Sequence, residues 1–345
     1  MRTFRIELND TTTLNRRLSW RFDMNKNKLF LVMISFSFWL SSSLCAQNYP
    51  NRAVKLIVTN PAGGSSDIMA RTIAQKLSEL WKQSVIVENK AGGGGTIGMV
   101  YAANQPADGY TILFGAQGPT TVTPLLSKVP YEMTRDFYPL SLVSTGPSVM
   151  LVQASLAERN LQDFIALAKA KPNTLNFGSG GVGNAHHLSA ELLNLASGIQ
   201  TTHVPYKGGI AAANDLAAGQ IQFMFAEVAP VMPLIKAGKL RPIAVASPKR
   251  IALLPEVPTF IESGFPGFIS IVSWGLYLPT GVATSVIAQL QIDVRRVMTD
   301  PDLVKRFAEL GFEAQYSSPD EYRQFLAAET IKYARIIKEN RIKAE

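Results

Sequence analysis

The stretch Val54–Ile73, VKLIVTNPAGGSSDIMARTI, is the part of the sequence that decides the fold. It begins with a short β-branched run, which is typical of a buried parallel strand. A Pro-Ala-Gly-Gly turn follows, and then apolar residues recur at helical spacing, at Met69, Ile73 and Leu77. The pattern predicts a strand, a tight turn and an amphipathic helix, which is the first unit of an α/β fold.

The turn in this unit also has the composition of an anion site. Gly63 and Gly64 have no side chains that would cover the backbone N–H groups at the start of the helix. One of Ser65, Ser66 and Asp67 is expected to cap the first helical turn. Because a helix N-terminus carries partial positive charge, a carboxylate or phosphate could dock there without Lys or Arg. The alternative is that the two glycines only make a tight turn.

Residues 1–46 are predicted to be a leader outside the fold. A basic segment at Asn25–Lys28 precedes twelve apolar residues, Leu29–Leu40, and small residues then lead to Ala46. This order is typical of a secretory signal peptide. We expect cleavage after Ala46 and a true start at Met24, because the upstream residues would make an unusually long first region. An uncleaved N-terminal anchor is the alternative, although the apolar run is short for a membrane span.

Cysteine content and charge narrow the class of protein. The one cysteine, Cys45, lies in the leader, and Leu44 before it is too large for a lipoprotein signal. The mature chain would then have no disulfide and no thiol nucleophile. The leader holds seven Lys and Arg and three Asp and Glu, so the other 27 basic and 23 acidic residues give +4. These charges are dispersed, which disfavours nucleic-acid binding, and no later run is long enough to span a membrane. We therefore expect a soluble protein in the periplasm.

Strands and helices alternate along most of the chain, which predicts parallel sheets. Two strand passages, near Val143–Gln153 and Leu240–Ser247, bracket about 100 residues. A chain that leaves one lobe, builds a second and returns needs two such crossings. We predict that residues 47–145 plus 250–345 form lobe 1 and that residues 146–249 form lobe 2. One continuous sheet is the alternative that periodicity does not exclude.

After the passage at residues 240–247 comes a stretch rich in Pro and Gly, which runs to Gly281. Two long helices are predicted after it, around Ser285–Thr299 and Pro319–Glu339.

The sequence lacks the usual catalytic and metal motifs. None of His186, His187 and His203 has a metal-ligand spacing. No nucleophile elbow, S-x-x-K or pair of carboxylates stands out. Glycines after residue 92 match G-x-G-x-x-G only weakly, because no acid follows at about twenty residues. We therefore predict a binding protein without catalytic residues, metal or cofactor.

A second glycine-rich turn, FGSGGVGNAHH at Phe177–His187, again lies between a predicted strand and a helix starting near His187. Asn184 is expected to be its N-cap. Two such helix N-termini, one in each lobe, could hold the two ends of a small dianion. His187 could donate to a carboxylate or serve as a structural hydrogen-bonder. Lys207, in a third glycine loop, could attract anions or simply be solvated.

Taken together, these segments resemble the periplasmic receptors of tripartite tricarboxylate transporters, the Bug-type binding proteins. The resemblance extends from Tyr49-Pro50 to the C-terminal helix, and ten motifs occur in the family's order. They are PAGGSSD at 61–67, VENKAGGGG at 87–95, DGYTIL at 108–113, LNFGSGGVG at 175–183, HL at 187–188, HVPYKG at 203–208, GQIQFMF at 219–225, IKAGKL at 235–240, LPEVPT at 254–259 and SW at 273–274.

The resemblance implies an α/β fold of two lobes, like type II periplasmic binding proteins, with two crossover strands between the lobes. It implies a monomeric receptor that closes on a small carboxylate and delivers it to membrane permease subunits. In that family, backbone amides and hydroxyls at the two glycine-rich turns hold the ligand. The positions that match are Ala62, Gly63, Gly64, Ser65 and Ser66 in lobe 1, with Asp67 as helix cap, and Ser179, Gly183, Asn184 and Ala185 in lobe 2, with His187 beside them.

Three positions of the implied site depart from the family's pattern. Asn60 stands where an aromatic is usual, and Asn184 where Ser or Thr is usual. Ala226 replaces a frequent acid, and Glu227 follows one position later. Each change alters the polarity of the pocket, so the ligand of a relative does not transfer. A ligand-sensing lobe for a signalling partner, and an enzyme on the same lobes, are the alternative functions.

Overall fold

The computed structural model describes residues 49–339 and 342 of the 345-residue chain. The predictions on the signal peptide, its cleavage, the start at Met24 and Cys45 lie outside the described residues. Two β-sheets with flanking helices make up the fold. Among the described residues, no helix is both long and apolar enough to cross a lipid bilayer.

The first sheet contains six strands in the order β11-β4-β10-β3-β1-β2. Its parallel half is built from the predicted βα units, and its other half is antiparallel. The strands are β1 (Val54–Val58), β2 (Val85–Asn89), β3 (Thr111–Ala116), β4 (Phe137–Pro147), β10 (Ile271–Pro279) and β11 (Glu313–Ala314). The helices around it are α2 (Ser65–Trp81), α3 (Thr96–Ala103), α4 (Thr123–Leu126), α5 (Met133–Asp136), α10 (Thr284–Met298), α11 (Pro301–Glu309) and α12 (Pro319–Glu339), with the short turns η1 (Gly93–Gly95) and η2 (Gly118–Val122).

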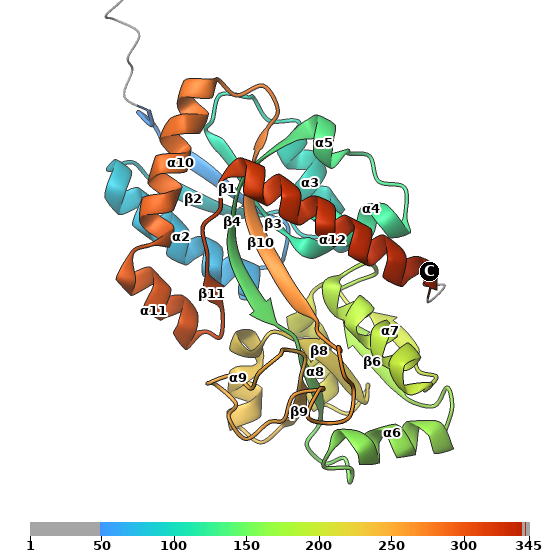
Figure 1. Ribbon diagram of the computed structural model, residues 1–345. Coiled ribbons are helices and arrows are strands. Elements are labelled where there is room, and N and C mark those ends of the chain that lie inside the picture. The colour runs from blue at the N-terminus through green and yellow to red at the C-terminus, as the bar shows by residue number, and fades with distance from the viewer. Residues whose placement is uncertain (1–48, 340–341, 343–345) are drawn as a thin grey trace, which may run out of the picture. The chain divides into compact units, whose positions relative to one another are not determined.

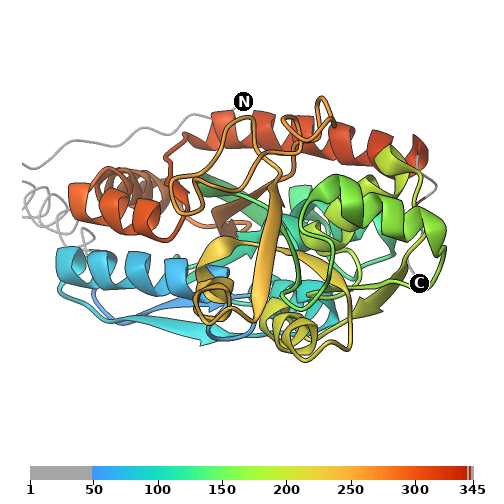
Figure 2. The ribbon, with the colours of Figure 1, turned by 90° about the horizontal axis from the view of Figure 1, so that it is seen from below.

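Strand β1 has a continuous apolar run because both of its faces are buried. Leu56 packs in the same core cluster as Met69 and Ile73 of α2, which are fully buried as their helical spacing predicts. Ile57 points to the opposite face and joins the cluster that contains Tyr277 of β10. Helices α2, α10 and α11 lie together at one flank of this sheet (Figures 1 and 2).

The second sheet contains five strands in the order β7-β6-β8-β5-β9. Strands β6, β7 and β8 are parallel, whereas β5 runs antiparallel to β8 and β9. The strands are β5 (Val149–Gln153), β6 (Asn176–Ser179), β7 (Thr202–Pro205), β8 (Phe223–Ala226) and β9 (Leu240–Val245). The helices are α6 (Leu161–Ala170), α7 (Ala185–Ser197), α8 (Gly209–Ala217) and α9 (Val228–Lys236).

Two chain segments cross between the sheets, as the predicted fold class requires. The first crossing joins β4 to β5 through Ser148, and the second enters β10 from Ser270; β4 and β10 run side by side (Figure 1). The Ser148 N–H donates to the Ser270 carbonyl at 2.9 Å, so the two crossings are hydrogen-bonded to each other. Together they form a narrow, paired connection between the two sheets.

The second crossing is not where the sequence suggested it. The passage at residues 240–247 was expected to cross, but its strand β9 belongs entirely to the second sheet. The return to the first sheet is β10, which lies in the Pro- and Gly-rich stretch to which no strand was assigned. Before it, Phe260 and Phe268 stack on each other at 4.2 Å and pack in the core of the second sheet. Pro and Gly therefore mark turns around this segment, and the packing of its aromatic rings attaches it to the second sheet. The predicted lobe boundaries stay a prediction.

Gly275 lies at the centre of β10, where a glycine is unusual in a strand, and it leaves space for the Tyr322 ring. A Cβ at Gly275 would overlap with the hydroxyl and Cζ of Tyr322, whose ring is fully buried against this strand. We expect Gly275→Ala to lower the free energy of unfolding by about 3 kcal/mol, because the ring has no free space into which to move. Urea denaturation measures this loss. Tyr322→Phe/Gly275→Ala should not restore stability, whereas Tyr322→Leu/Gly275→Ala should restore part of it; equal stability of Gly275→Ala and wild type would contradict the packing argument.

Candidate functional site

Four helix N-termini meet at one hollow between the sheets. Each of α2, α7, α8 and α9 follows a strand directly, namely β1, β6, β7 and β8. Residues at the start of all four helices line the same space. Ligands of open α/β sheets bind at the carboxyl ends of the strands, and helix N-termini present unpaired N–H groups and positive partial charge there. The fold therefore concentrates anion-binding groups at this point.

The hollow consists of two adjoining cavities of about 80 and 100 Å³. Each is several times the volume that one water requires, which suits a small molecule. The residues that line both are Asn60, Pro61, Ser66, Asn184, His186, Lys207, Gly208 and Glu227. The first cavity is also lined by Gly64, Ser65, Gly209, Ile210, Ala211, Ala226, Pro230 and Val231, and the second by Gly92–Gly95, Ala185, Tyr206 and Trp274 among others.

The first-sheet wall of the hollow is the turn before α2. Helix α2 begins at Ser65, so its N-cap is Gly64, and no side chain caps it. Asp67 is not the N-cap residue; its carboxylate accepts the N–H of Gly63 at 2.9 Å and a hydrogen bond from Arg71. Burial alone would raise the pKa of Asp67, but these hydrogen bonds hold it below its usual value. Asp67 therefore stabilises the turn by accepting the Gly63 N–H, which is then not available to a ligand. The first N–H groups of α2 face the hollow.

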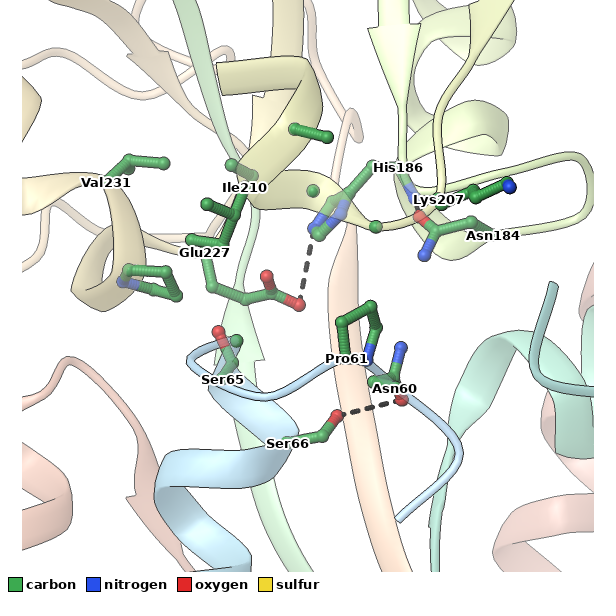
Figure 3. A pocket seen from close by; sticks show the side chains of 16 residues that line it. Asn60, Pro61, Ser65, Ser66, Asn184, His186, Lys207, Ile210, Glu227 and Val231 are labelled. Carbon is green, nitrogen blue, oxygen red and sulfur yellow. Dashed lines mark hydrogen bonds and ion pairs between the residues drawn. The ribbon is translucent and has the colours of Figure 1, made fainter. Parts of the chain in front are cut away.

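Asn60 is oriented by a hydrogen-bond network at the same wall. Its Oδ1 accepts hydrogen bonds from the hydroxyls of Thr59 and Ser66, both at 3.1 Å. Because an amide oxygen and nitrogen lie on opposite sides of Cγ, this directs Nδ2 of Asn60 away from the network and into the hollow (Figure 3). Ser66 Oγ in turn accepts from Trp274 Nε1 at 2.9 Å. Asn60 thus supplies an amide donor at the hollow.

Ser65 carries an unused polar group at the hollow. Its side chain is 5 % exposed, and Oγ has no hydrogen-bond partner among the described residues. Buried hydroxyls without a partner are rare because each costs stability. Ser65 is at the first position of α2 and lines the cavity. A hydroxyl in this state is a donor available to a molecule that enters the hollow.

On the opposite wall, His186 rather than His187 lies at the hollow. Helix α7 starts at Ala185, within two residues of the predicted start near His187, and the predicted N-cap is confirmed, because the Asn184 side chain accepts the N–H of His186 at 2.8 Å. Successive residues of a helix lie about 100° apart around its axis, so the two neighbouring histidines face different sides, and His186 faces the hollow. His186 is 5 % exposed, and its Nε2 has no hydrogen-bond partner among the described residues.

His187 is part of the core of the second sheet. Its Nδ1 accepts the N–H of Gly183 at 3.3 Å, and its ring stacks on His203 at 4.0 Å between centroids. His203 Nε2 in turn lies 2.7 Å from Ser179 Oγ, which is fully buried. Burial lowers the pKa of His187 to about 4 and, together with the charge of His187, that of His203 to about 3. Both rings are therefore neutral at pH 7 and support the glycine turn.

Glu227 places a carboxylate in the hollow. It is the residue before α9, its side chain makes no cap hydrogen bond, and Oε1 lies 3.5 Å from His186 Nε2 (Figure 3). Among the described residues that line either cavity, it is the one carboxylate. Lys207 lines both cavities, is exposed, and forms no ion pair with another described residue. Neither Glu227 nor His186 was predicted as a site residue.

The structure brings together about half of the predicted site residues. Those that line the hollow are Asn60, Gly64, Ser65, Ser66, Asn184, Ala185 and Ala226. Those that do not line it are Ala62, Gly63, Asp67, Ser179, Gly183 and His187. The second group shapes the two turns from behind or from outside. Among the described residues no cluster of three or more His, Cys, Asp or Glu could hold a metal ion.

Two contacts join the walls through glycine. A Cβ at Gly208 would lie 2.7 Å from Cγ of Pro61, and a Cβ at Gly94 would lie 2.8 Å from the carbonyl oxygen of Val182. No side chain fits at either point, so backbone from one sheet meets atoms from the other directly. These contacts close the hollow on two sides.

The comparisons with known proteins agree with this architecture. The chain is similar to a solved structure described as Rhodopseudomonas palustris Rpa4515 with adipate, with 32% identity over 86% of this chain and 99% of that one, and a TM-score of 0.83. It is similar to the periplasmic binding protein BugD, with 30% identity over 86% of this chain and 100% of that one, and a TM-score of 0.81. It is also similar to MatC from the same Rhodopseudomonas species, which is described with bound malate. The identity is 28% over 84% of this chain and 100% of that one, and the TM-score is 0.79.

The fold is therefore that of periplasmic binding proteins of this type, which confirms the predicted fold class. Residues 69–342 match the model of the tripartite tricarboxylate transporter family receptors. The chain belongs to this receptor family, and the resemblance found in the sequence is confirmed.

Proposed function

We propose that this protein is a periplasmic receptor that binds a small organic acid in the hollow and delivers it to the permease of a tripartite transporter. The observation that carries the proposal is the meeting of four helix N-termini at one space with an unpartnered hydroxyl, Ser65 Oγ, directed to it. Backbone N–H groups, the Ser65 hydroxyl and the Asn60 amide are donors, which is the set that a carboxylate requires.

Closure follows from the connection between the sheets. The paired crossings at Ser148 and Ser270 are narrow, so the predicted lobes can rotate about them as a hinge. A ligand that contacts both walls stabilises the closed population only. The division into two lobes belongs to this proposal, with the second boundary at the Ser270 crossing in place of the predicted residues 249–250, because Phe260 and Phe268 pack in the core of the second sheet. Export by the leader and a monomeric state belong to it as well.

Membership of the receptor family supports binding and delivery rather than turnover. The adipate and malate in the two related structures support a carboxylate as the kind of ligand. A screen of mono-, di- and tricarboxylates by thermal shift, followed by mass spectrometry of the released compound, tests the proposal. Release of a chemically altered acid would support the enzyme alternative instead. Stimulation of a signalling partner without uptake would support the sensor alternative.

Ser65 gives a specific test of the anion site. Ser65→Ala removes a donor that has no partner in the protein, so we expect the affinity for the best carboxylate of the screen to fall by about tenfold or more. Stability should stay the same or rise slightly, because an unsatisfied buried hydroxyl is lost. Calorimetric titration and a melting curve measure the two effects.

Ser66→Ala is the matched control, because the Ser66 hydroxyl already bonds to Trp274 and Asn60. It should lower stability by about 1–2 kcal/mol, which separates the structural hydroxyl from the binding one. Unchanged affinity in Ser65→Ala would argue against a ligand at the start of α2.

A further inference from the structure

We infer that Glu227 makes this hollow selective for a carboxylate that also carries a protonated amine, and that it disfavours a second carboxylate at the same end. The inference rests on the proposed function and names the chemical class of its ligand. Glu227 lines both cavities, and its carboxylate extends into the space that the helix N-termini surround (Figure 3).

The Glu227 carboxylate has few interactions with other described residues. As the residue before α9 it could cap that helix, but its side chain accepts no cap hydrogen bond. Its one close polar neighbour among the described residues is His186 Nε2 at 3.5 Å, which is too long for a hydrogen bond. His186 Nε2 itself has no hydrogen-bond partner among the described residues. The ion pair with His186 is long and leaves both carboxylate oxygens able to accept a shorter hydrogen bond from a ligand.

The charges around Glu227 set the kind of donor. The first-sheet wall attracts a carboxylate, because it contains the start of α2 and the side-chain amide of Asn60. Glu227 projects from the second-sheet wall and repels a second carboxylate that approaches it. An ammonium group matches this oxygen pair in charge and in its donors. A ligand with one carboxylate at the first wall and an ammonium near Glu227 therefore fits both walls.

Pairs of compounds that differ only in this group test the inference. We expect wild-type protein to bind 4-aminobutanoate more tightly than succinate, and 5-aminopentanoate more tightly than glutarate, in at least one pair by about tenfold or more. In Glu227→Gln the preference should shrink by about tenfold, with weaker binding of the amine and tighter binding of the dicarboxylate. Titration calorimetry at constant salt concentration measures both affinities.

Two control variants separate the possible outcomes. Glu256→Gln makes the same charge change at an exposed position outside the hollow and should leave the preference unchanged. Ser65→Ala should weaken both members of a pair equally, since it acts on the shared carboxylate. Succinate and glutarate binding as well as the amines, or an unchanged preference in Glu227→Gln, would show that His186 neutralises Glu227 internally and would overturn the inference. Binding of no carboxylate at all would instead overturn the proposed function.

Discussion

Gly64→Leu should abolish measurable carboxylate binding while the protein stays folded. Gly64 has φ −79° and ψ 172°, an extended conformation that any residue adopts, and its Cβ would lie 3.5 Å from the nearest atom, the carbonyl of Pro61. The added side chain would enter the hollow and cover the first N–H groups of α2. Since each hydrogen bond to an ionised group contributes about 1.5–3 kcal/mol, loss of two corresponds to a decrease in affinity of about a hundredfold or more.

Calorimetric titration with the best carboxylate of the screen measures this loss. Gly64→Ala should give an intermediate affinity, because a methyl group fills less of the space. Ala62→Leu adds the same side chain to the same turn at an exposed position that does not line the hollow, and should leave binding intact. Gly63 is a poorer test, since its φ of +80° would strain any other residue. Wild-type affinity in Gly64→Leu would refute a ligand site at this turn.

The free energy of unfolding should fall by about 4 kcal/mol between pH 7 and pH 5 because of two buried histidines. Burial lowers the pKa of His187 to about 4 and that of His203 to about 3, whereas both titrate near 6.5 in the unfolded chain. Between these values the unfolded state binds more protons than the folded state, so stability decreases as the pH falls below about 6.5. The loss continues down to the folded pKa values and is complete below them.

Urea denaturation at pH 7, 6 and 5 measures this dependence. His187→Asn does not titrate and keeps an acceptor near the position of Nδ1 for the N–H of Gly183. We expect its loss between pH 7 and pH 5 to be about half that of the wild type. Carboxylates with lowered pKa values, such as Asp67 and Asp300, lose their contribution only at lower pH. An equally steep dependence in His187→Asn would mean that this ring does not control acid stability.

The sequence was sufficient to predict most of the fold because its βα units follow simple patterns. Strand β1, helix α2 and helix α12 lie where apolar periodicity placed them, within a few residues. Strand β10 was missed because a glycine in its centre and Pro and Gly before it resemble a loop. Gly275 is there to admit the Tyr322 ring, a contact 47 residues away along the chain. Local patterns do not contain such long-range packing.

The candidate site was predictable at its glycine turns and less so in its side chains. Asn60, Ser65 and Asn184 line the hollow because turn chemistry marks the start of a helix, and their role in ligand binding stays a prediction. His186 and His187 are neighbours in α7 and face different sides of the helix, and the sequence pattern did not distinguish which of the two faces the hollow. Glu227 was noted only as a displaced acid. Its position follows from the register of β8, which pairing across the sheet determines.

The contacts at Pro61–Gly208 and Gly94–Val182 limit how far the two walls can approach. Backbone and ring atoms already meet there, so further narrowing is sterically blocked whatever compound is inside. In the closed form proposed above, these contacts therefore set the smallest distance between the walls. Acids of different chain length must be accommodated by the orientation of flexible side chains such as Lys207 and Glu227, and compounds that are too long would hold the two sheets apart and leave the receptor unable to present a closed surface.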